Sequence, residues 1–168
     1  MWNSIISTSN EIQNKDIKKI INGKNSSIII KNFYEKENCD KIIQKISNTN
    51  IENDSKKFNH IGPFLMNYTT RKEKYFQNAK KANIIFKKIF SNVENPVNKI
   101  KLTMSKSFPN YKISETKENE LDYALCNIRR HVKGKVVPLH KDNVKYEGIE
   151  YNISKINNQL SCILHLQQ

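Results

Sequence analysis

The sequence predicts an α+β domain in which helices come first and strands follow. Apolar residues recur with the helical spacing i, i+3, i+4, i+7 in residues 35–46, and they line one side of residues 70–90. Further along, Leu121, Tyr123 and Leu125 alternate with their neighbours as in a half-buried strand. Because the helical segments precede the strand segments, we predict helices packed on a sheet that is part of a jelly roll.

The segments before residue 70 predict short elements. Residues 1–24 are polar with a weak helical pattern of isoleucines, which indicates a short helix or a loosely attached lead-in. The apolar run Ile28–Ile30 predicts a short buried strand, and Glu35–Ile46 predicts an amphipathic helix. We therefore divide the chain into a polar lead-in at residues 1–24 and a single domain at residues 25–168.

Residues 70–90 predict a long helix, and alternation beyond it predicts strands at residues 100–104, 121–130 and 160–166. The side of the helix that is expected to pack against the strands carries Tyr75, Phe76, Ala79, Phe86 and Phe90. Before it, residues 58–65 are a loop that could cover the mouth of a site, although the pattern favours an ordinary surface histidine for His60 in this loop.

Length and charge restrict the class of protein. A chain of 168 residues suffices for one domain with its own core. The net charge of +13 is typical of nucleic-acid-binding proteins. The lysines are spread along the whole chain, however, which is typical of a compositional bias and does not favour a nucleic-acid partner.

The cysteines predict a reducing compartment. Cys39, Cys126 and Cys162 are odd in number, widely spaced and placed in apolar segments, so we expect buried, reduced thiols and a cytoplasmic protein. The sequence shows neither the pattern of a signal peptide nor an apolar run of membrane-spanning length, so we expect no membrane association.

The motif with the clearest chemistry is His140-x-Asp142. Residues i and i+2 of a strand point to the same face, so an imidazole and a carboxylate at this spacing can converge on one metal ion. Such a pair forms two thirds of a 2-His-1-carboxylate triad, which binds Fe(II) and leaves positions open for a co-substrate and oxygen. The motif alone is short enough to occur by chance, so its surroundings have to support it.

Those surroundings resemble the Fe(II)- and 2-oxoglutarate-dependent oxygenases, especially the prolyl-4-hydroxylase-like branch. The strand Leu125–Arg130 is followed by His131 at a position where the family has Tyr, then by Gly134, and His140 and Asp142 follow in register. Residues 28–43 resemble the opening strand and first helix of the family. Residues 160–166 resemble the strand after the metal motif, with His165 where Tyr is common.

The resemblance implies a fold, cofactors and a site. The implied fold is a set of N-terminal helices on a partial double-stranded β-helix (the jelly roll), which we expect to be truncated here. The implied cofactors are Fe(II) and 2-oxoglutarate, with His140 and Asp142 as the expected metal ligands. The family's distal histidine and its basic neighbour are expected beyond Leu166, so the chain is expected to be an N-terminal portion that is inactive alone. His165 is expected to hydrogen-bond the co-substrate and not to replace the distal ligand.

A row of polar residues precedes the metal motif. Asn127, Arg129 and His131 share one face of a regular strand, and this row either contacts co-substrate or substrate inside the barrel or faces solvent on an edge strand. Both interpretations stay open.

The leading functional hypothesis is a dioxygenase that hydroxylates a small molecule, an amino acid or a peptide side chain. One alternative is a catalytically inactive jelly-roll binding module that has lost a ligand, and the other is a basic nucleic-acid-binding domain. Loops carry the specificity of such scaffolds, so the sequence names neither the substrate nor an oligomeric state.

Overall fold

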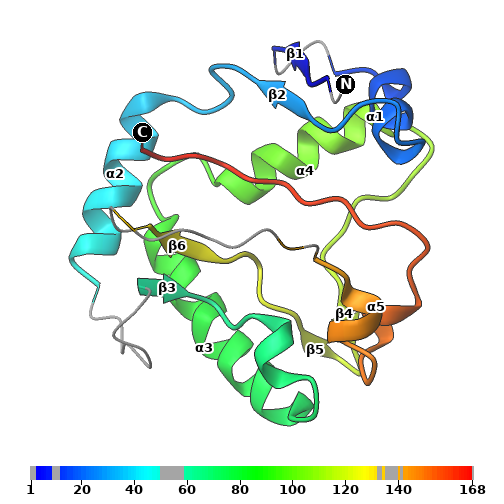
Figure 1. Cartoon of the computed structure of the whole chain (residues 1–168). Helices are drawn as coiled ribbons and strands as arrows, with labels where there is room; N and C mark the ends of the chain where they lie inside the picture. Colours follow the sequence, from blue (N-terminus) through cyan, green and yellow to red (C-terminus); the bar gives the residue numbers. More distant parts are fainter. Residues whose placement is uncertain are drawn as a thin grey trace. The chain divides into compact units, whose positions relative to one another are not determined.

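The computed structural model describes residues 3–8, 12–49, 59–131, 134, 140 and 142–167. The chain forms two compact units, and each combines segments that lie far apart in the sequence. The first unit contains residues 1–44, 90–114 and 164–168, and the second contains residues 45–89 and 115–163. Figure 1 labels the helices and strands of both units.

The first unit contains a parallel two-stranded sheet. Strand β1 (Ile5–Ser7) pairs in register with β2 (Ile28–Ile30), and helix α1 (Asn14–Ile21) lies between them in the sequence. Strand β2 confirms the strand predicted at this position, and α1 confirms the helical interpretation of the polar segment. Strand β1 has no counterpart among the predicted elements.

Helix α2 (Lys36–Ser47) confirms the amphipathic helix predicted from residue 35 to residue 46. Its buried side includes Cys39 and Ile42. On its exposed side, ion pairs at i, i+4 spacing join Lys36 to Asp40 at 2.7 Å and Lys41 to Glu37 at 2.6 Å. Exposed pairs of this kind are screened by water and contribute little, so the buried side accounts for most of the stability of the helix.

The strand predicted at residues 100–104 is wrong, because these residues lie in helix α4 (Pro96–Ser107). The Asn95 side chain accepts hydrogen bonds from the backbone N–H groups of Val97 and Asn98, and Pro96 occupies the first helical turn. Asn followed by Pro therefore starts a helix here. Ile100 and Met104 are half-buried at i, i+4 spacing, whereas Leu102 is 64% exposed.

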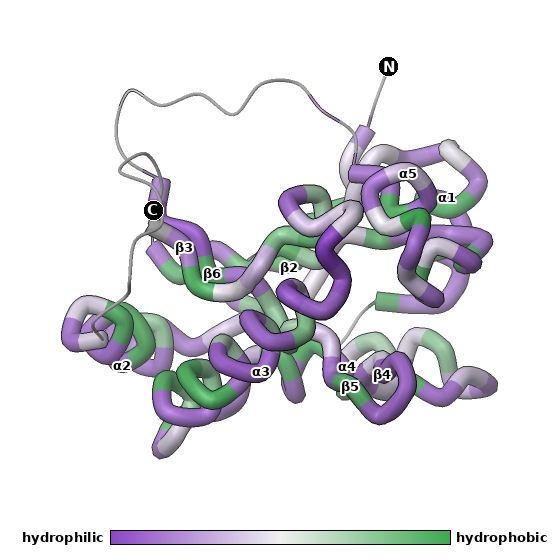
Figure 2. Tube along the Cα trace, turned by 90° about the horizontal axis from the view of Figure 1, so that it is seen from below, coloured by the Kyte–Doolittle hydropathy of each residue, from purple (hydrophilic) through white to green (hydrophobic). Residues whose placement is uncertain are grey.

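The second unit is organised around helix α3 (Lys72–Ile89), which confirms the long helix predicted at residues 70–90. Its buried residues are Tyr75, Phe76, Ala79, Ala82, Phe86 and Ile89. Tyr75, Phe76 and Ala79 form a core cluster with Tyr151, and Tyr123 packs against it. Ring centroids are 5.1 Å apart for Phe76 and Tyr123 and 5.5 Å apart for Tyr75 and Tyr151. Figure 2 shows apolar and polar positions alternating along the helices, as expected for helices with one buried side.

The remaining elements of the second unit are short. They are β3 (Asn59–Ile61), η1 (Leu65–Tyr68), β4 (Lys117–Glu118), β5 (Leu121–Asp122), β6 (Ile128–Arg130), α5 (Val144–Glu147) and η2 (Asn152–Lys155). Strand β3 pairs antiparallel with β6, and β4 pairs antiparallel with β5.

The described residues do not confirm the predicted jelly roll, because none of their sheets has more than two strands. Of the strand predicted over residues 121–130, only β5 and β6 form. The strand predicted at residues 160–166 is wrong. The described residues give it no pairing partner, and Ile163 is 79% exposed. The structure confirms the α+β class to the extent that it combines helices with small sheets.

The three thiols differ in burial, and all are free. Cys39 is buried, Cys126 is half-buried, and Cys162 is exposed, so the expectation of burial is wrong for Cys162. Within the described part of the chain, no helix combines the length and the apolar character that crossing a membrane requires.

Candidate metal centre

The β3–β6 ladder positions the chain that leads to the candidate metal ligands. Its register pairs Asn59 with Arg130, His60 with Arg129, and Ile61 with Ile128. Since side chains alternate across a strand, Ile61 and Ile128 share one face, and His60 and Arg129 share the other. Ile61 is 3% exposed, so the face carrying the two isoleucines is the buried one.

Glycine at position 62 allows the chain to approach this ladder closely. Gly62 has a φ of +102°, and a Cβ atom there would lie 2.7 Å from Asn127 Oδ1 and 2.7 Å from the Cys126 carbonyl oxygen. Neither the conformation nor the contact tolerates a larger residue. The side chain of Asn127 is thus set against the backbone at the end of β3.

The side chains of His140 and Asp142 converge. His140 Nε2 lies 3.5 Å from Asp142 Oδ1, although neither residue belongs to a strand. The two side chains are 54% and 56% exposed, so the pair lies at the surface and not inside a jelly roll such as the sequence predicted. The residues between His131 and His140, apart from Gly134, and Lys141 lie outside the described residues.

The segment after the pair is anchored to the second unit. The Asn143 side chain caps α5 by accepting the backbone N–H of Lys145 at 3.1 Å. The N–H of Val144 donates to Gln159 Oε1 at 3.0 Å, and Val144 is 8% exposed. Asp142 therefore directly precedes the capped start of α5.

The donor set of the pair fits a first-row divalent metal ion. Imidazole nitrogen and carboxylate oxygen are the donors of the non-haem iron triad. Two donors that each lie about 2.1 Å from one ion, at a right angle, are about 3 Å apart. The observed separation of 3.5 Å is close enough for a small rotation of either side chain to bring both onto one ion. A third donor is not assembled beside them: the described residues contain no cluster of three or more His, Cys, Asp or Glu side chains.

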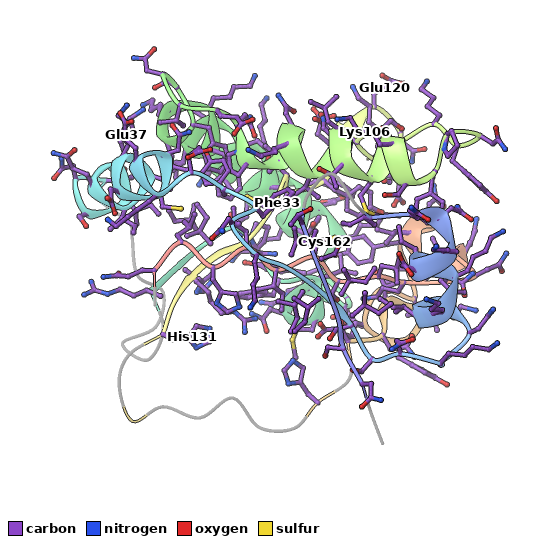
Figure 3. All side chains as sticks on the ribbon, turned by 90° about the horizontal axis from the view of Figure 1, so that it is seen from above. Phe33, Glu37, Lys106, Glu120, His131 and Cys162 are labelled. Carbon is purple, nitrogen blue, oxygen red and sulfur yellow. The ribbon has the colours of Figure 1, made fainter. Side chains whose placement is uncertain are left out.

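The other predicted site residues are placed separately. Asn127, Arg129 and His131 are exposed, and Figure 3 shows His131 at the end of β6. His165 is also exposed and belongs to the first unit. Two hollows in the second unit, of about 220 and 310 Å³, are lined by none of the predicted site residues.

Cys126, next to Asn127, is a half-buried thiol. Burial raises the pKa of this thiol to about 12, so without a bound metal it stays protonated at neutral pH and is a poor nucleophile.

The environment of Arg129 was not predicted from the sequence. Its guanidinium carbon lies 4.3 Å from the centre of the Phe64 ring, and the His60 ring lies 4.8 Å from the same ring. The loop predicted at residues 58–65 is therefore partly a strand, and His60 within it is half-buried in β3. The i, i+4 spacing of His60 and Phe64 was visible in the sequence, but their shared contact with Arg129 depends on the β3–β6 pairing.

Comparison with known proteins identifies the family. The model of the family described as carrier-protein-independent halogenase WelO5 matches residues 4–168. Neither a curated protein nor a solved structure matches the chain. The WelO5 family lies within the Fe(II)- and 2-oxoglutarate-dependent oxygenase superfamily and uses these two cofactors. The resemblance predicted from the sequence is confirmed at that level, without support for the prolyl-4-hydroxylase-like branch. The chain belongs to the WelO5 halogenase family of non-haem iron enzymes.

Proposed function

We propose that this chain is an Fe(II)- and 2-oxoglutarate-dependent enzyme that hydroxylates a small molecule, an amino acid or a peptide side chain, and that it does not halogenate its substrate. The observation that carries the proposal is the carboxylate of Asp142, which lies 3.5 Å from His140 Nε2. Membership of the family supports the cofactors, and the identity of residue 142 supports the choice between the two reactions.

The choice between hydroxylation and halogenation depends on how many coordination positions around the iron the protein itself fills. Halogen transfer would require a halide among the ligands of the iron. With His140, Asp142 and a second histidine as protein donors, the remaining positions would be left to the co-substrate and oxygen. A halide would therefore need a triad that lacks one protein donor. If Asp142 binds as the carboxylate of the triad, that position is filled.

The residues of the chain would hold and surround the cofactors. His140 would bind iron through neutral Nε2, and Asp142 would bind through its carboxylate. When bound, Fe(II) and 2-oxoglutarate supply the oxidising power for inserting oxygen into a C–H bond. Asn127, Arg129 and His131 are proposed to contact co-substrate or substrate, and His165 is proposed to hydrogen-bond the co-substrate. The distal histidine stays a prediction. Neither the inactive binding module nor the nucleic-acid-binding domain is favoured by an observation.

Metal binding tests the proposal without requiring turnover. Mn(II), a paramagnetic ion that accepts the same donors, is titrated into the 168-residue chain while the ring signals of its histidines are followed by NMR. We expect the His140 signals to broaden first. His140→Ala removes these signals, and Asp142→Ala should weaken Mn(II) binding by about tenfold, as losing one of two donors predicts.

A matched carboxylate provides the control. Asp122 is 57% exposed, similar to Asp142, and Asp122→Ala should leave the His140 broadening unchanged. Equal broadening of all histidines, or equal effects of the two aspartate variants, would contradict the assignment of the metal site.

A further inference from the structure

His60, Phe64 and Arg129 form one contact group, which we name the Phe64 cluster. The Arg129 guanidinium carbon lies 4.3 Å from the centre of the Phe64 ring. The His60 ring lies 4.8 Å from the same ring at an interplanar angle of 41°. His60 and Arg129 are also directly opposite each other in the β3–β6 ladder. Two elements and the loop after β3 therefore converge on one aromatic ring.

Arg129 forms no ion pair with a carboxylate within the described part of the chain, whereas Lys72 pairs with Glu118 and Lys99 pairs with Glu94. An arginine that stacks on an aromatic face keeps its fork of N–H donors available, and the stack restricts the rotation of its long side chain. A donor that is held in place before binding loses less entropy when a ligand arrives.

The face of the ladder that carries the cluster is the one turned away from the core. Ile61 and Ile128 occupy the opposite face, and Ile61 is buried. Beyond Ile61, a Cβ on Gly62 would lie 3.3 Å from the Phe86 ring of α3. Arg129 is exposed, and His60 and Phe64 are half-buried, so a ligand can reach all three.

We propose that the Phe64 cluster is a binding site for a carboxylate-bearing ligand. A guanidinium fork matches the two oxygens of a planar carboxylate and forms two parallel charge-assisted hydrogen bonds. The His60 ring supplies a further N–H donor on the same face, and the Phe64 ring supplies an apolar wall for the carbon atom next to the carboxylate. This inference rests on the proposed function for the source of the carboxylate, which is either 2-oxoglutarate or an acidic group of the substrate.

Carboxylate binding is measured on the metal-free 168-residue chain, where chelation by iron plays no part. The His60 ring signals, assigned by single His→Gln variants, are followed by NMR during titration with 2-oxoglutarate in one arm and with N-acetylglycine in the other. Ionic strength is held constant with sodium chloride. Saturable shifts with 2-oxoglutarate alone assign the cluster to the co-substrate, and saturable shifts with N-acetylglycine alone assign it to the substrate. Shifts with both identify a general carboxylate site.

The neighbouring arginine gives a matched control. Arg130 is exposed, carries the same charge and lies on the opposite face of β6. Loss of a bidentate charge-assisted contact predicts that Arg129→Gln weakens binding by about tenfold or more. Arg130→Gln should weaken it by no more than about twofold, through long-range charge alone. Phe64→Leu keeps apolar volume but removes the stack, so it should weaken binding by several-fold while far-UV circular dichroism stays unchanged.

The proposal is overturned if neither ligand gives a saturable shift, or if the two arginine variants weaken binding equally. Mn(II) binding is recorded for the same variants. Arg129→Gln should leave the broadening of His140 intact, so that failure of the carboxylate site and failure of the metal site are recognised separately.

Discussion

Glu118 is a buried carboxylate whose charge we predict to stabilise the second unit. The residue is 2% exposed. Its carboxylate forms an ion pair with Lys72 of α3 and accepts hydrogen bonds from the Tyr123 hydroxyl and the backbone N–H of Asn152. One side chain thus connects β4 to α3 and to η2. We predict that Glu118→Gln, which keeps the shape and removes the charge, lowers the free energy of unfolding.

The magnitude follows from which interactions glutamine retains. Its carbonyl oxygen can still accept from Tyr123 and Asn152, but its amide group then faces the Lys72 ammonium. Breaking a buried ion pair by removing one partner costs about 3–5 kcal/mol. The Lys72 side chain is 30% exposed and is partly solvated when unpaired, so we expect a loss of about 2–3 kcal/mol.

The pH dependence of stability has a defined sign. Burial acts to raise the pKa of Glu118, but the hydrogen bonds from Lys72, Tyr123 and Asn152 outweigh it and lower the pKa below the ordinary value of 4.5. The unfolded chain therefore takes up this proton at a higher pH than the folded chain does. The stabilisation is fully present above pH 4.5 and is lost as the pH falls below it. The difference between wild type and Glu118→Gln should shrink on acidification.

Urea denaturation followed by far-UV circular dichroism measures both effects. Glu120→Gln is the control, because Glu120 is an exposed carboxylate two residues away. A change of the same charge on the surface should alter stability by no more than about 0.5 kcal/mol. If Glu118→Gln and Glu120→Gln proved equally stable, or if their difference persisted unchanged in acid, the ion pair would contribute nothing and the reasoning would be refuted.

Three further predictions follow from local geometry. Gly62→Ala should lower the free energy of unfolding by more than about 2 kcal/mol in the same urea assay, because φ is +102° and the added Cβ would lie 2.7 Å from Asn127 Oδ1. An unchanged denaturation midpoint would show that the turn relaxes. Asn95→Ala removes the cap of α4 and should cost about 1 kcal/mol, whereas Asn95→Asp should restore most of it. Asp142→Gly removes one donor of the pair and should weaken Co(II) binding, followed by visible absorption, by about tenfold. An unchanged Co(II) affinity would contradict the role assigned to Asp142.

The sequence predicted those elements whose signal is local. Helices α2 and α3 and strand β2 carry their pattern within their own residues, and each forms where it was expected. Strand β1 is only three residues long, and its partner β2 lies more than twenty residues away, so no local pattern marks it. Helix α4 was missed because Asn95-Pro96 can end one helix or begin the next, and the choice depends on which backbone N–H groups the Asn95 side chain reaches.

The candidate site, like the fold, was predictable only where its contacts lie between residues close in the sequence. The spacing of His140 and Asp142 sufficed to bring their side chains within 3.5 Å, even though the strand that was expected to carry them is absent at both residues. The stacking of Arg129 on Phe64 was not predictable, because it requires the antiparallel register of β3 and β6. Contacts within a few residues follow from backbone geometry, whereas contacts between strands follow only from their pairing.

Membership of the family indicates which cofactors the chain binds, whereas the identity of residue 142 bears on which reaction it catalyses. Membership of the WelO5 family describes a scaffold that binds Fe(II) and 2-oxoglutarate, and a scaffold can host more than one reaction. The reaction depends on which groups occupy the coordination positions around the metal. A halide and the Asp142 carboxylate would be alternative anionic ligands of the iron. If His140 and Asp142 bind the iron as proposed, the chain itself supplies this anion. Membership of the family therefore supports the binding of Fe(II) and 2-oxoglutarate, and the presence of Asp142 supports the proposal that the reaction is hydroxylation.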